Sequence, residues 1–287
     1  MNATRETTIV ITGASSGIGR ASTLHLARAG LRVYAGVRKD SDAQALRAEH
    51  PAIVPIAIDV ADAASIAAAK HRLEGEIAGL DGLVNNAGVG LTAPMEYVPL
   101  DALRRQFEID VFGQIAVTQA LLPLIRRARG RIVNMGSVGG HIAMPFGGVL
   151  CGCKSALRAM NDALRLELRP FGIHVCLIEP GSIRTPAVDK TLGDVDRTIA
   201  ALPPDGRERY AAMLREFTRR AYERAHHGSP PEVVARAVHH ALTAAKPRIR
   251  YPVGRDARAL VTLPRLLPDR WLDRLRVRLF GMPGEIR

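Results

Sequence analysis

A short segment with three glycines, Thr12-Gly13-Ala14-Ser15-Ser16-Gly17-Ile18-Gly19, carries the clearest chemical signal in this chain. It follows the β-branched run Thr8-Ile9-Val10-Ile11 and precedes a helical stretch, Arg20 to Ala29. Glycine allows a tight turn and lets the backbone approach a pyrophosphate, which the positive end of a helix stabilises. Three glycines alone are compatible with a flexible turn, but the strand before them and the helix after them favour a dinucleotide-binding turn.

The three cysteines, Cys151, Cys153 and Cys176, are too few and too irregularly spaced for a disulfide framework or a metal cage. We interpret Cys151 and Cys153 as small apolar side chains at a buried helix start. The sequence therefore predicts reduced thiols and no metal site.

The chain is basic, with 40 lysine and arginine residues against 28 acidic ones and a formal net charge of +12. Proteins that bind nucleic acids are also basic, but those that bind single strands stack the bases on aromatic side chains. Only 4% of the residues here are aromatic. We therefore expect a solvated, arginine-rich surface and no nucleic-acid partner.

The basic C-terminal extension, residues 256–287, interleaves arginines with Trp271, Leu272 and Phe280 in the pattern of an amphipathic helix. Such a helix either packs on its own domain or rests on anionic lipid. The sequence favours packing on the domain, with peripheral membrane contact as the alternative.

Strand-like apolar runs alternate with helical stretches along most of the chain. The expected strands are residues 8–11, 31–37, 53–58, 80–84, 131–135, 173–178 and 248–253, and the expected helices are residues 20–29, a stretch ending at Glu49, 63–77, 100–127, 154–168 and 230–245. This alternation predicts an α/β fold, a Rossmann-type doubly wound parallel sheet in one domain, residues 1–255, with ligands at the carboxyl ends of the strands. The polar segment 187–229 interrupts the alternation, and we expect a helical lid there, or else a plain surface insertion.

Residues 132–153 carry no formal charge over a length that suits a membrane span. Six glycines and polar residues such as Asn134, Ser137 and His141 argue against a lipid-facing helix. We interpret the segment as a buried strand followed by an active-site loop. Because no signal segment is recognisable at the N-terminus, we expect a cytoplasmic protein.

Several motifs occur in a fixed order along the chain. They are Thr12-Gly13-x3-Gly17-Ile18-Gly19, Asp59-Val60, Asn85-Asn86-Ala87-Gly88, Ser137, Lys154, and Pro180-Gly181 with Thr185. As an ordered set at these spacings, they resemble the short-chain dehydrogenase/reductase family over residues 7 to about 190, and the tail resembles it only loosely. The resemblance implies an oxidoreductase that uses a nicotinamide dinucleotide.

The resemblance also implies a role for each matching residue. The ribose and pyrophosphate would contact the glycine turn through Gly13, Ser15, Ser16, Ile18 and Gly19, with Gly17 in the same turn, and the adenine would contact Asp59 and Val60. The cofactor ribose and the sheet edge would contact Asn86, Ala87 and Gly88. The nicotinamide would contact Ile183 and Thr185 after Pro180-Gly181, and its ribose would contact Lys154.

Charge at the end of the second expected strand favours the phosphorylated cofactor. An enzyme for NAD usually places an acidic residue there, which binds the ribose hydroxyls and repels a 2′-phosphate. This chain has Val37 followed by Arg38 and Lys39. We therefore predict NADP, with NAD as the alternative if Arg38 simply points into solvent.

Two of the four catalytic positions that the resemblance implies are altered. The family's tyrosine acid stands four residues before the lysine and about 13 after the serine, and both counts reach Leu150, which cannot donate a proton. The family's asparagine falls on Asp110, whereas Ser137 and Lys154 are retained. General acid catalysis contributes roughly 10²–10⁴-fold in rate, so we expect a slow reaction or a different proton donor.

Three substitute donors are open at this point: Ser137 with Lys154 and a water behind it, His141 from the loop, or Tyr210 from the lid. Residues 138–149 are rich in Gly, Val, Met and Phe, which indicates a hydrophobic substrate such as a steroid-, retinoid- or lipid-like carbonyl compound. We predict an NADP(H)-dependent oxidoreductase that interconverts an alcohol and a carbonyl. The alternative is a cofactor-binding but catalytically silent sensor or partner subunit, and the resemblance implies a homodimer or homotetramer formed through helices 100–127 and 154–168.

Overall fold

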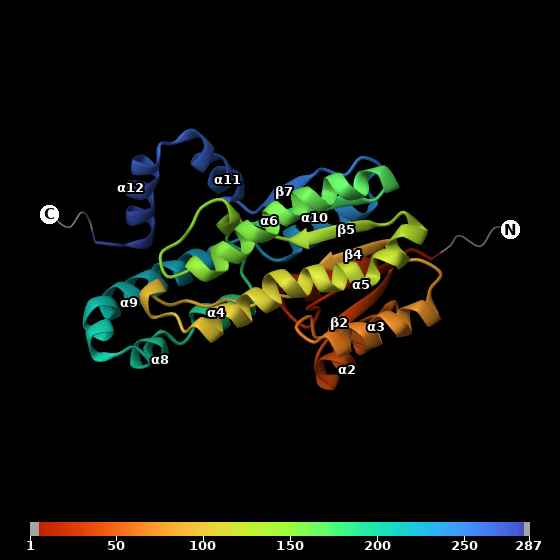
Figure 1. Ribbon diagram of the computed structural model, residues 1–287, viewed down its shortest axis with the longest axis horizontal. Coiled ribbons are helices and arrows are strands. Elements are labelled where there is room, and N and C mark those ends of the chain that lie inside the picture. Colours follow the sequence, from red (N-terminus) through yellow and green to blue (C-terminus); the bar gives the residue numbers. More distant parts are fainter. Residues whose placement is uncertain (1–5, 284–287) are drawn as a thin grey trace.

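Seven parallel strands form one sheet in the order β3-β2-β1-β4-β5-β6-β7, in a computed structural model that describes residues 6–283 (Figure 1). The strands are β1 Thr8–Ile11, β2 Arg32–Val37, β3 Ile53–Ala57, β4 Gly82–Asn85, β5 Arg131–Met135, β6 His174–Pro180 and β7 Arg250–Val253. The strand order reverses between β1 and β4, and in such sheets this reversal opens a crevice at the carboxyl ends of the strands. The predicted doubly wound α/β fold is therefore confirmed.

Helices connect the strands and continue beyond the sheet. They are α1 Gly17–Arg28, α2 Asp40–Glu49, α3 Ala63–Glu76, α4 Leu100–Phe107, α5 Gly113–Ala128, α6 Gly148–Leu168, α7 Pro186–Leu192, α8 Val195–Ala200, α9 Pro204–His226, α10 Glu232–Thr243, α11 Ala257–Leu266 and α12 Asp269–Phe280. A π-helical turn, Glu108–Phe112, joins α4 to α5 in one continuous rod, and a short 3₁₀ turn, Val138–Gly140, follows β5.

Each face of the sheet is covered by its own hydrophobic core. One core joins the strands to α1 and α10, and the other joins them to α3, α5 and the end of α6. The four residues of β1 are all buried, as expected for a parallel strand with helices on both sides. This burial on both faces explains why the strands read as continuous apolar runs.

A third hydrophobic cluster lies outside the sheet, among the helices that follow β6. Its buried members are Phe146, Ile199, Leu202, Leu214, Phe217 and Phe280. They join the loop before α6 to α8, α9 and α12, which gather at the left of Figure 1, where β5 points. These helices therefore pack against the active-site loop rather than against the sheet.

Residues Leu100–Ala128, which comprise α4, the π turn and α5, form the one helix within residues 6–283 that is long and apolar enough to cross a membrane. The mean hydropathy of its most apolar window is 1.3, and 56% of that window is buried. Val117, Leu121 and Leu124 of α5 pack in the second core against the sheet. The apolar character of this segment is thus used in the core of the domain.

Two helices begin three or more residues earlier than expected. Helix α1 begins at Gly17 instead of Arg20, and α6 begins at Gly148 instead of Lys154, so Leu150, Cys151 and Cys153 are helical. The segment 132–153 is therefore a strand, a loop and the first turns of a helix, not a strand and a loop only.

The C-terminal extension folds as α11 and α12 as far as the structure describes it, and residues 284–287 of the predicted extension lie outside the described part. Leu272 and Phe280 of α12 are buried, in line with the expected packing on the domain. Trp271 instead is 60% exposed, on the outer side of the helix.

Candidate active site

The glycine turn brings the backbone of β1 close to the start of α1. Gly13 has a φ of +64°, and a Cβ at this position would lie 2.8 Å from the Cα of Ala87. A Cβ at Gly19 would lie 2.1 Å from the carbonyl oxygen of Gly13. Ser16 is the N-cap of α1, but its hydroxyl makes no capping hydrogen bond. The turn thus presents free backbone N–H groups and a free hydroxyl at a helix N-terminus, which suits a pyrophosphate.

The end of β4 is tied to this turn by Thr12 and Asn86. The Thr12 hydroxyl accepts hydrogen bonds from the backbone N–H groups of Asn86 at 3.0 Å and Ala87 at 3.1 Å. The Asn86 amide donates to the carbonyl oxygens of Thr12 at 3.0 Å and Gly13 at 3.1 Å. The predicted Asn86-Ala87 pair therefore fixes the shape of the turn from the neighbouring strand, and Thr12 is a residue whose role the sequence did not show.

The segment after β6 closes the other side of the same crevice. The Gly181 N–H donates to the carbonyl of Val253 at 2.9 Å, and Ile183 forms a parallel bridge with Ser229. Thr185 lies opposite the glycine turn, where its Cβ would be 3.3 Å from a Cβ placed on Gly17. The two motifs, far apart in sequence, thus face each other.

Asp256 holds the loop that follows Pro180 in place. Its carboxylate accepts hydrogen bonds from the Ser182 N–H at 3.1 Å and the Ser182 hydroxyl at 2.6 Å. Sequence reasoning missed this residue, because 74 positions separate it from Ser182 and no motif marks it.

The predicted adenine and phosphate residues lie side by side at the ends of β2 and β3. The exposed guanidinium of Arg38 lies 3.9 Å from Asp59 Oδ2, and Asp59 Oδ1 accepts a hydrogen bond from the Ala61 N–H at 3.0 Å. Val60 is buried beside Gly113, and Lys39 is exposed at the start of α2. Arg38 is therefore mostly exposed, with one long contact to Asp59.

Ser137 and Lys154 both lie at the end of β5. Ser137 caps the 3₁₀ turn by accepting a hydrogen bond from the Gly139 N–H at 3.0 Å. Lys154 is buried, and its Nζ donates to the carbonyl oxygen of Met135 at 3.1 Å. Leu150 stands one turn before Lys154 on the same helix, half-buried, so the two side chains share a face of α6.

Asp110 lies next to Lys154 and is completely buried. Its Oδ1 accepts a hydrogen bond from the Val89 N–H at 2.8 Å, and its Oδ2 lies 3.8 Å from Lys154 Nζ. Desolvation by burial raises the pKa of Asp110 above its usual range, although Lys154 acts in the opposite direction. Gly88 permits this placement, since even a Cβ there would come within 3.2 Å of Asp110 Oδ1.

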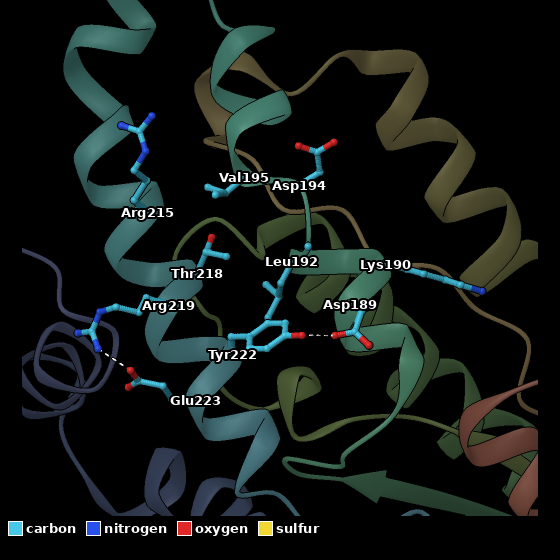
Figure 2. Close-up of a pocket in the computed structure, with 11 residues that line it drawn as sticks. Asp189, Lys190, Leu192, Asp194, Val195, Arg215, Thr218, Arg219, Tyr222 and Glu223 are labelled. Carbon is cyan, nitrogen blue, oxygen red and sulfur yellow. Dashed lines mark hydrogen bonds and ion pairs between the residues drawn. The ribbon is translucent and has the colours of Figure 1, made fainter.

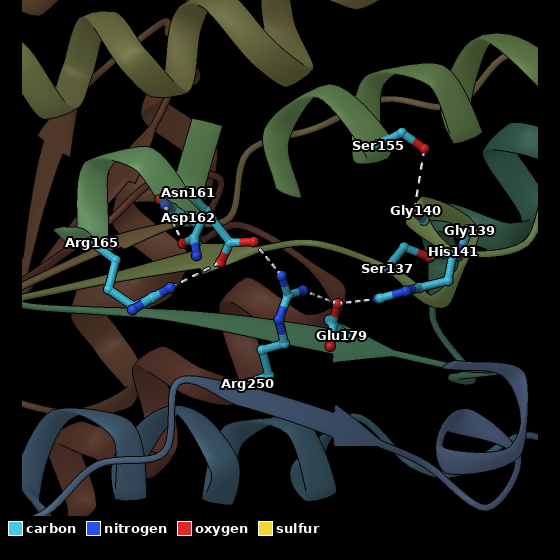
Figure 3. Close-up of polar contacts among 11 residues, drawn as sticks. Ser137, Gly139, Gly140, His141, Ser155, Asn161, Asp162, Arg165, Glu179 and Arg250 are labelled. Carbon is cyan, nitrogen blue, oxygen red and sulfur yellow. Dashed lines mark hydrogen bonds and ion pairs between the residues drawn. The ribbon is translucent and has the colours of Figure 1, made fainter. Parts of the chain in front are cut away.

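His141, one of the three candidate proton donors, is not free. Its side chain is 4% exposed, and its Nε2 lies 2.5 Å from Glu179 Oε1, as Figure 3 shows. Arg250 bridges Glu179 at 3.0 Å to Asp162 of α6 at 2.5 Å. The loop after Ser137 is thereby anchored to β6, β7 and α6, and the sequence did not show this pairing because Glu179 lies 38 residues further along the chain.

Tyr210 is likewise bound elsewhere. Its hydroxyl donates to Glu96 Oε2 at 2.8 Å, and this hydrogen bond raises the pKa of Tyr210. Burial raises the pKa of the thiol of Cys151 and, to about 12, that of Cys153. Neither thiol is therefore an effective acid near neutral pH, and within residues 6–283 no three His, Cys, Asp or Glu side chains gather as a metal site.

The sequence matches the short chain dehydrogenase family over residues 7–195. It is 36% identical to retinol dehydrogenase 5 of Homo sapiens, over 96% of this chain and 90% of that protein. The chain belongs to the short-chain dehydrogenase/reductase family. The family predicted from the sequence is confirmed, and the protein is an oxidoreductase of this type.

Two further proteins show how far the similarity extends. The NADPH-dependent 3-dehydrocapnine reductase of Ornithobacterium rhinotracheale is 33% identical over 93% of this chain and 94% of its own. A short chain dehydrogenase from Burkholderia cenocepacia J2315, solved in complex with NADP, aligns with a TM-score of 0.70 at 25% identity over 96% of this chain and 97% of its own. Similarity to the short-chain dehydrogenase/reductase family thus includes the region beyond residue 195.

One cavity of this short-chain dehydrogenase/reductase is lined by residues of the helices after β6 and not by Ser137. It has a volume of about 840 Å³ and opens between α7, α8 and α9, where the Tyr222 hydroxyl donates to Asp189 at 2.6 Å (Figure 2). Charged side chains such as Arg215 and Glu223 surround apolar ones such as Leu192. The cavity belongs to the segment predicted as a lid.

Proposed function

We propose that this short-chain dehydrogenase/reductase uses NADP(H) to interconvert an alcohol and a carbonyl on a hydrophobic substrate. The observation that carries the proposal is the convergence of the glycine turn, Thr185, Ser137 and Lys154 at the carboxyl edge of one sheet. Positions where a Cβ would collide, as at Gly13 and Gly19, fit close approach of a dinucleotide backbone. When bound, the nicotinamide supplies or accepts the hydride.

The residues of the chain orient the substrate and move the proton. Ser137, held by its turn, has a hydroxyl that can donate a hydrogen bond to the substrate oxygen. Lys154 binds the ribose hydroxyls through its ammonium, which also stabilises negative charge that develops on the substrate oxygen. The packed loop around Phe146 and the lid cluster exclude water from this edge.

We propose NADP as the preferred cofactor, with NAD used less well. Support comes from the end of β2, where Val37, Arg38 and Lys39 include two cations and no acidic residue. Further support comes from the solved relative that binds NADP. Arg38→Ala should raise the Kd of NADPH about tenfold and leave that of NADH unchanged, because only NADPH carries the 2′-phosphate. Arg47→Ala, an exposed change on α2, is the matched control, and equal effects on both cofactors would contradict the proposal.

The substrate class is proposed from the apolar loop and lid. Phe146 and Met144 of the loop pack with Phe217 and Leu192 of the lid, and the human relative is named for retinol. Apolar side chains in the loop that follows Ser137 favour steroid-, retinoid- or lipid-like compounds. Short, polar ketones should therefore show a lower kcat/KM than long apolar carbonyl compounds.

The central experiment follows NADPH oxidation with a panel of hydrophobic ketones and aldehydes. We expect slow turnover by the wild type, loss of turnover in Lys154→Ala, and a rise of about 10–100-fold in Leu150→Tyr, since a hydroxyl then stands one turn before Lys154. If the wild type binds NADPH but only Leu150→Tyr reacts, the protein is the catalytically silent sensor or partner subunit.

We propose a homodimer or homotetramer formed through α5 and α6. Leu166 and Met160 of α6 are 57% and 39% exposed, and Phe112 before α5 is 52% exposed. Leu166→Arg should place a charge in this interface and shift the mass toward the monomer in light scattering after gel filtration. A monomeric wild type would contradict the proposal.

We propose that the enzyme works in the cytoplasm, without nucleic acid, and that α12 packs on the domain. Trp271 is exposed, so it could also contact a membrane surface as the alternative. Co-sedimentation with anionic vesicles tests this contact. Binding that is lost in Trp271→Ala would show that the C-terminal extension meets lipid.

A further inference from the structure

Helix α6 carries a leucine where it needs an acid, and other groups that bear protons near the site are already engaged. Tyr210 donates to Glu96, Tyr97 donates to Asp205 at 2.8 Å, and His141 is bound to Glu179. The hydrogen bond to Asp205 raises the pKa of Tyr97 to about 12. These three groups are therefore not free to protonate the substrate oxygen, and Ser137, whose hydroxyl can donate to that oxygen, needs a group behind it that replaces the proton.

Asp110 is a titratable side chain beside Lys154. It is completely buried in the π turn between α4 and α5, and its Oδ2 makes no hydrogen bond with any residue from 6 to 283. The Lys154 ammonium lies 3.8 Å from that oxygen. One buried carboxyl oxygen is thus directed to the ammonium while the other is held by the Val89 N–H.

The cation that faces Asp110 is Lys154. Lys154 and Cys153 face it from α6, and Gln106 faces it from α4 with a neutral amide. Burial raises the pKa of Asp110, the lysine lowers it, and the net direction is upward. A carboxyl in such an environment releases and recovers a proton closer to neutral pH than a solvated one does.

We propose that Asp110 is the proton source of the reaction and delivers its proton through Lys154. In carbonyl reduction the reduced nicotinamide, when bound, would supply the hydride to the carbonyl carbon, and the Lys154 ammonium would give a proton to the resulting alkoxide oxygen. The protonated Asp110 carboxyl then returns a proton to the amine, and the Asp110 carboxylate later regains one from solvent. Alcohol oxidation runs the same transfers in reverse. This inference rests on the proposed function.

The decisive variant is Asp110→Asn, because the amide has the same shape but cannot release a proton. We expect kcat for carbonyl reduction to fall about 10²-fold or more and its pH dependence to flatten, while the Kd of NADPH stays within about threefold of the wild type. Asp101→Asn, a 95% exposed change on α4, is the matched control and should leave kcat and its pH profile unchanged. A purely structural role of Asp110 would not remove a limb of the pH profile.

Two further measurements keep the inference open to refutation. Leu150→Tyr in the Asp110→Asn background should restore turnover, because the phenol then donates directly. Infrared difference spectra of the protein without cofactor should show a protonated carboxyl band that is lost on raising the pH and is missing in Asp110→Asn. Unchanged turnover and pH profile in Asp110→Asn would overturn this inference alone, whereas a wild type that binds NADPH and never turns over would overturn the proposed function as well.

Discussion

Gly13 shows at the scale of a single residue how the cofactor turn depends on a missing side chain. Its φ is +64°, and an added Cβ would lie 2.8 Å from the Cα of Ala87, which is backbone and cannot move aside. Gly30 is the matched control, with a φ of +84° and no heavy atom within 4 Å of an added Cβ.

Gly13→Ala should therefore lose more than about 2 kcal/mol of unfolding free energy and bind NADPH weakly, because it adds a clash to the left-handed conformation. Gly30→Ala should lose only about 1 kcal/mol and keep NADPH binding. Urea denaturation and calorimetric titration measure both quantities. Equal losses in the two variants would contradict the steric argument.

Asp110 makes a second prediction at this scale, on stability as a function of pH. A carboxyl with a raised folded-state pKa binds more protons in the folded than in the unfolded state, so stability falls as pH rises through the window between the two pKa values. Relative to Asp110→Asn, the wild type should lose about 1.4 kcal/mol per pH unit, starting above the unfolded-state pKa of about 4 and ending at the folded-state pKa. Guanidinium denaturation across pH measures the unfolding free energy of each protein, with Asp101→Asn as control. If burial of Asp110 had no effect, the difference in unfolding free energy between the wild type and Asp110→Asn would be the same at every pH.

At the scale of elements, a buried ionic network joins the active-site loop to the sheet. Arg250 of β7 contacts Glu179 of β6, whose side chain is 1% exposed, and Asp162 of α6, while Glu179 also contacts His141 (Figure 3). A buried carboxylate that loses a cationic partner keeps its desolvation cost.

Arg250→Met should accordingly reduce the unfolding free energy by about 3 kcal/mol and weaken catalysis, because the loop that carries Ser137 is released. Arg215→Met breaks an ion pair with Asp196 that is 58% and 77% exposed, so it should cost less than about 1 kcal/mol. Chemical denaturation of both variants checks the contrast. A small effect of Arg250→Met would mean that His141 alone neutralises Glu179.

At the scale of the whole molecule, the three cysteines report on cooperative unfolding. All three are buried and unpaired, and burial raises the pKa of Cys176 to about 11 and that of Cys153 to about 12. Because only the thiolate reacts, native protein at pH 7.5 should show no rapid reaction with a disulfide reagent, and three thiols should appear in urea. Rapid labelling of Cys151 in native protein would show that the start of α6 opens on its own.

The sequence by itself determined the parallel sheet and the cofactor turn. Buried strands such as β1 must be apolar along their whole length, and glycines such as Gly13 mark places where no Cβ fits, so both features are visible in local residue types. The family and the fold class followed from the order of these local motifs.

Other features were decided only in three dimensions. Gly147 and Gly148 disfavour a helix by local propensity, yet α6 starts at Gly148, since packing against the 3₁₀ turn, where Gly140 approaches the Lys154 backbone, outweighs propensity. The pairing of His141 with Glu179 and of Asp110 with Lys154 depends on residues about 40 positions apart. Local sequence cannot show whether a polar side chain is buried or what neutralises it, because both depend on which strands and helices become neighbours.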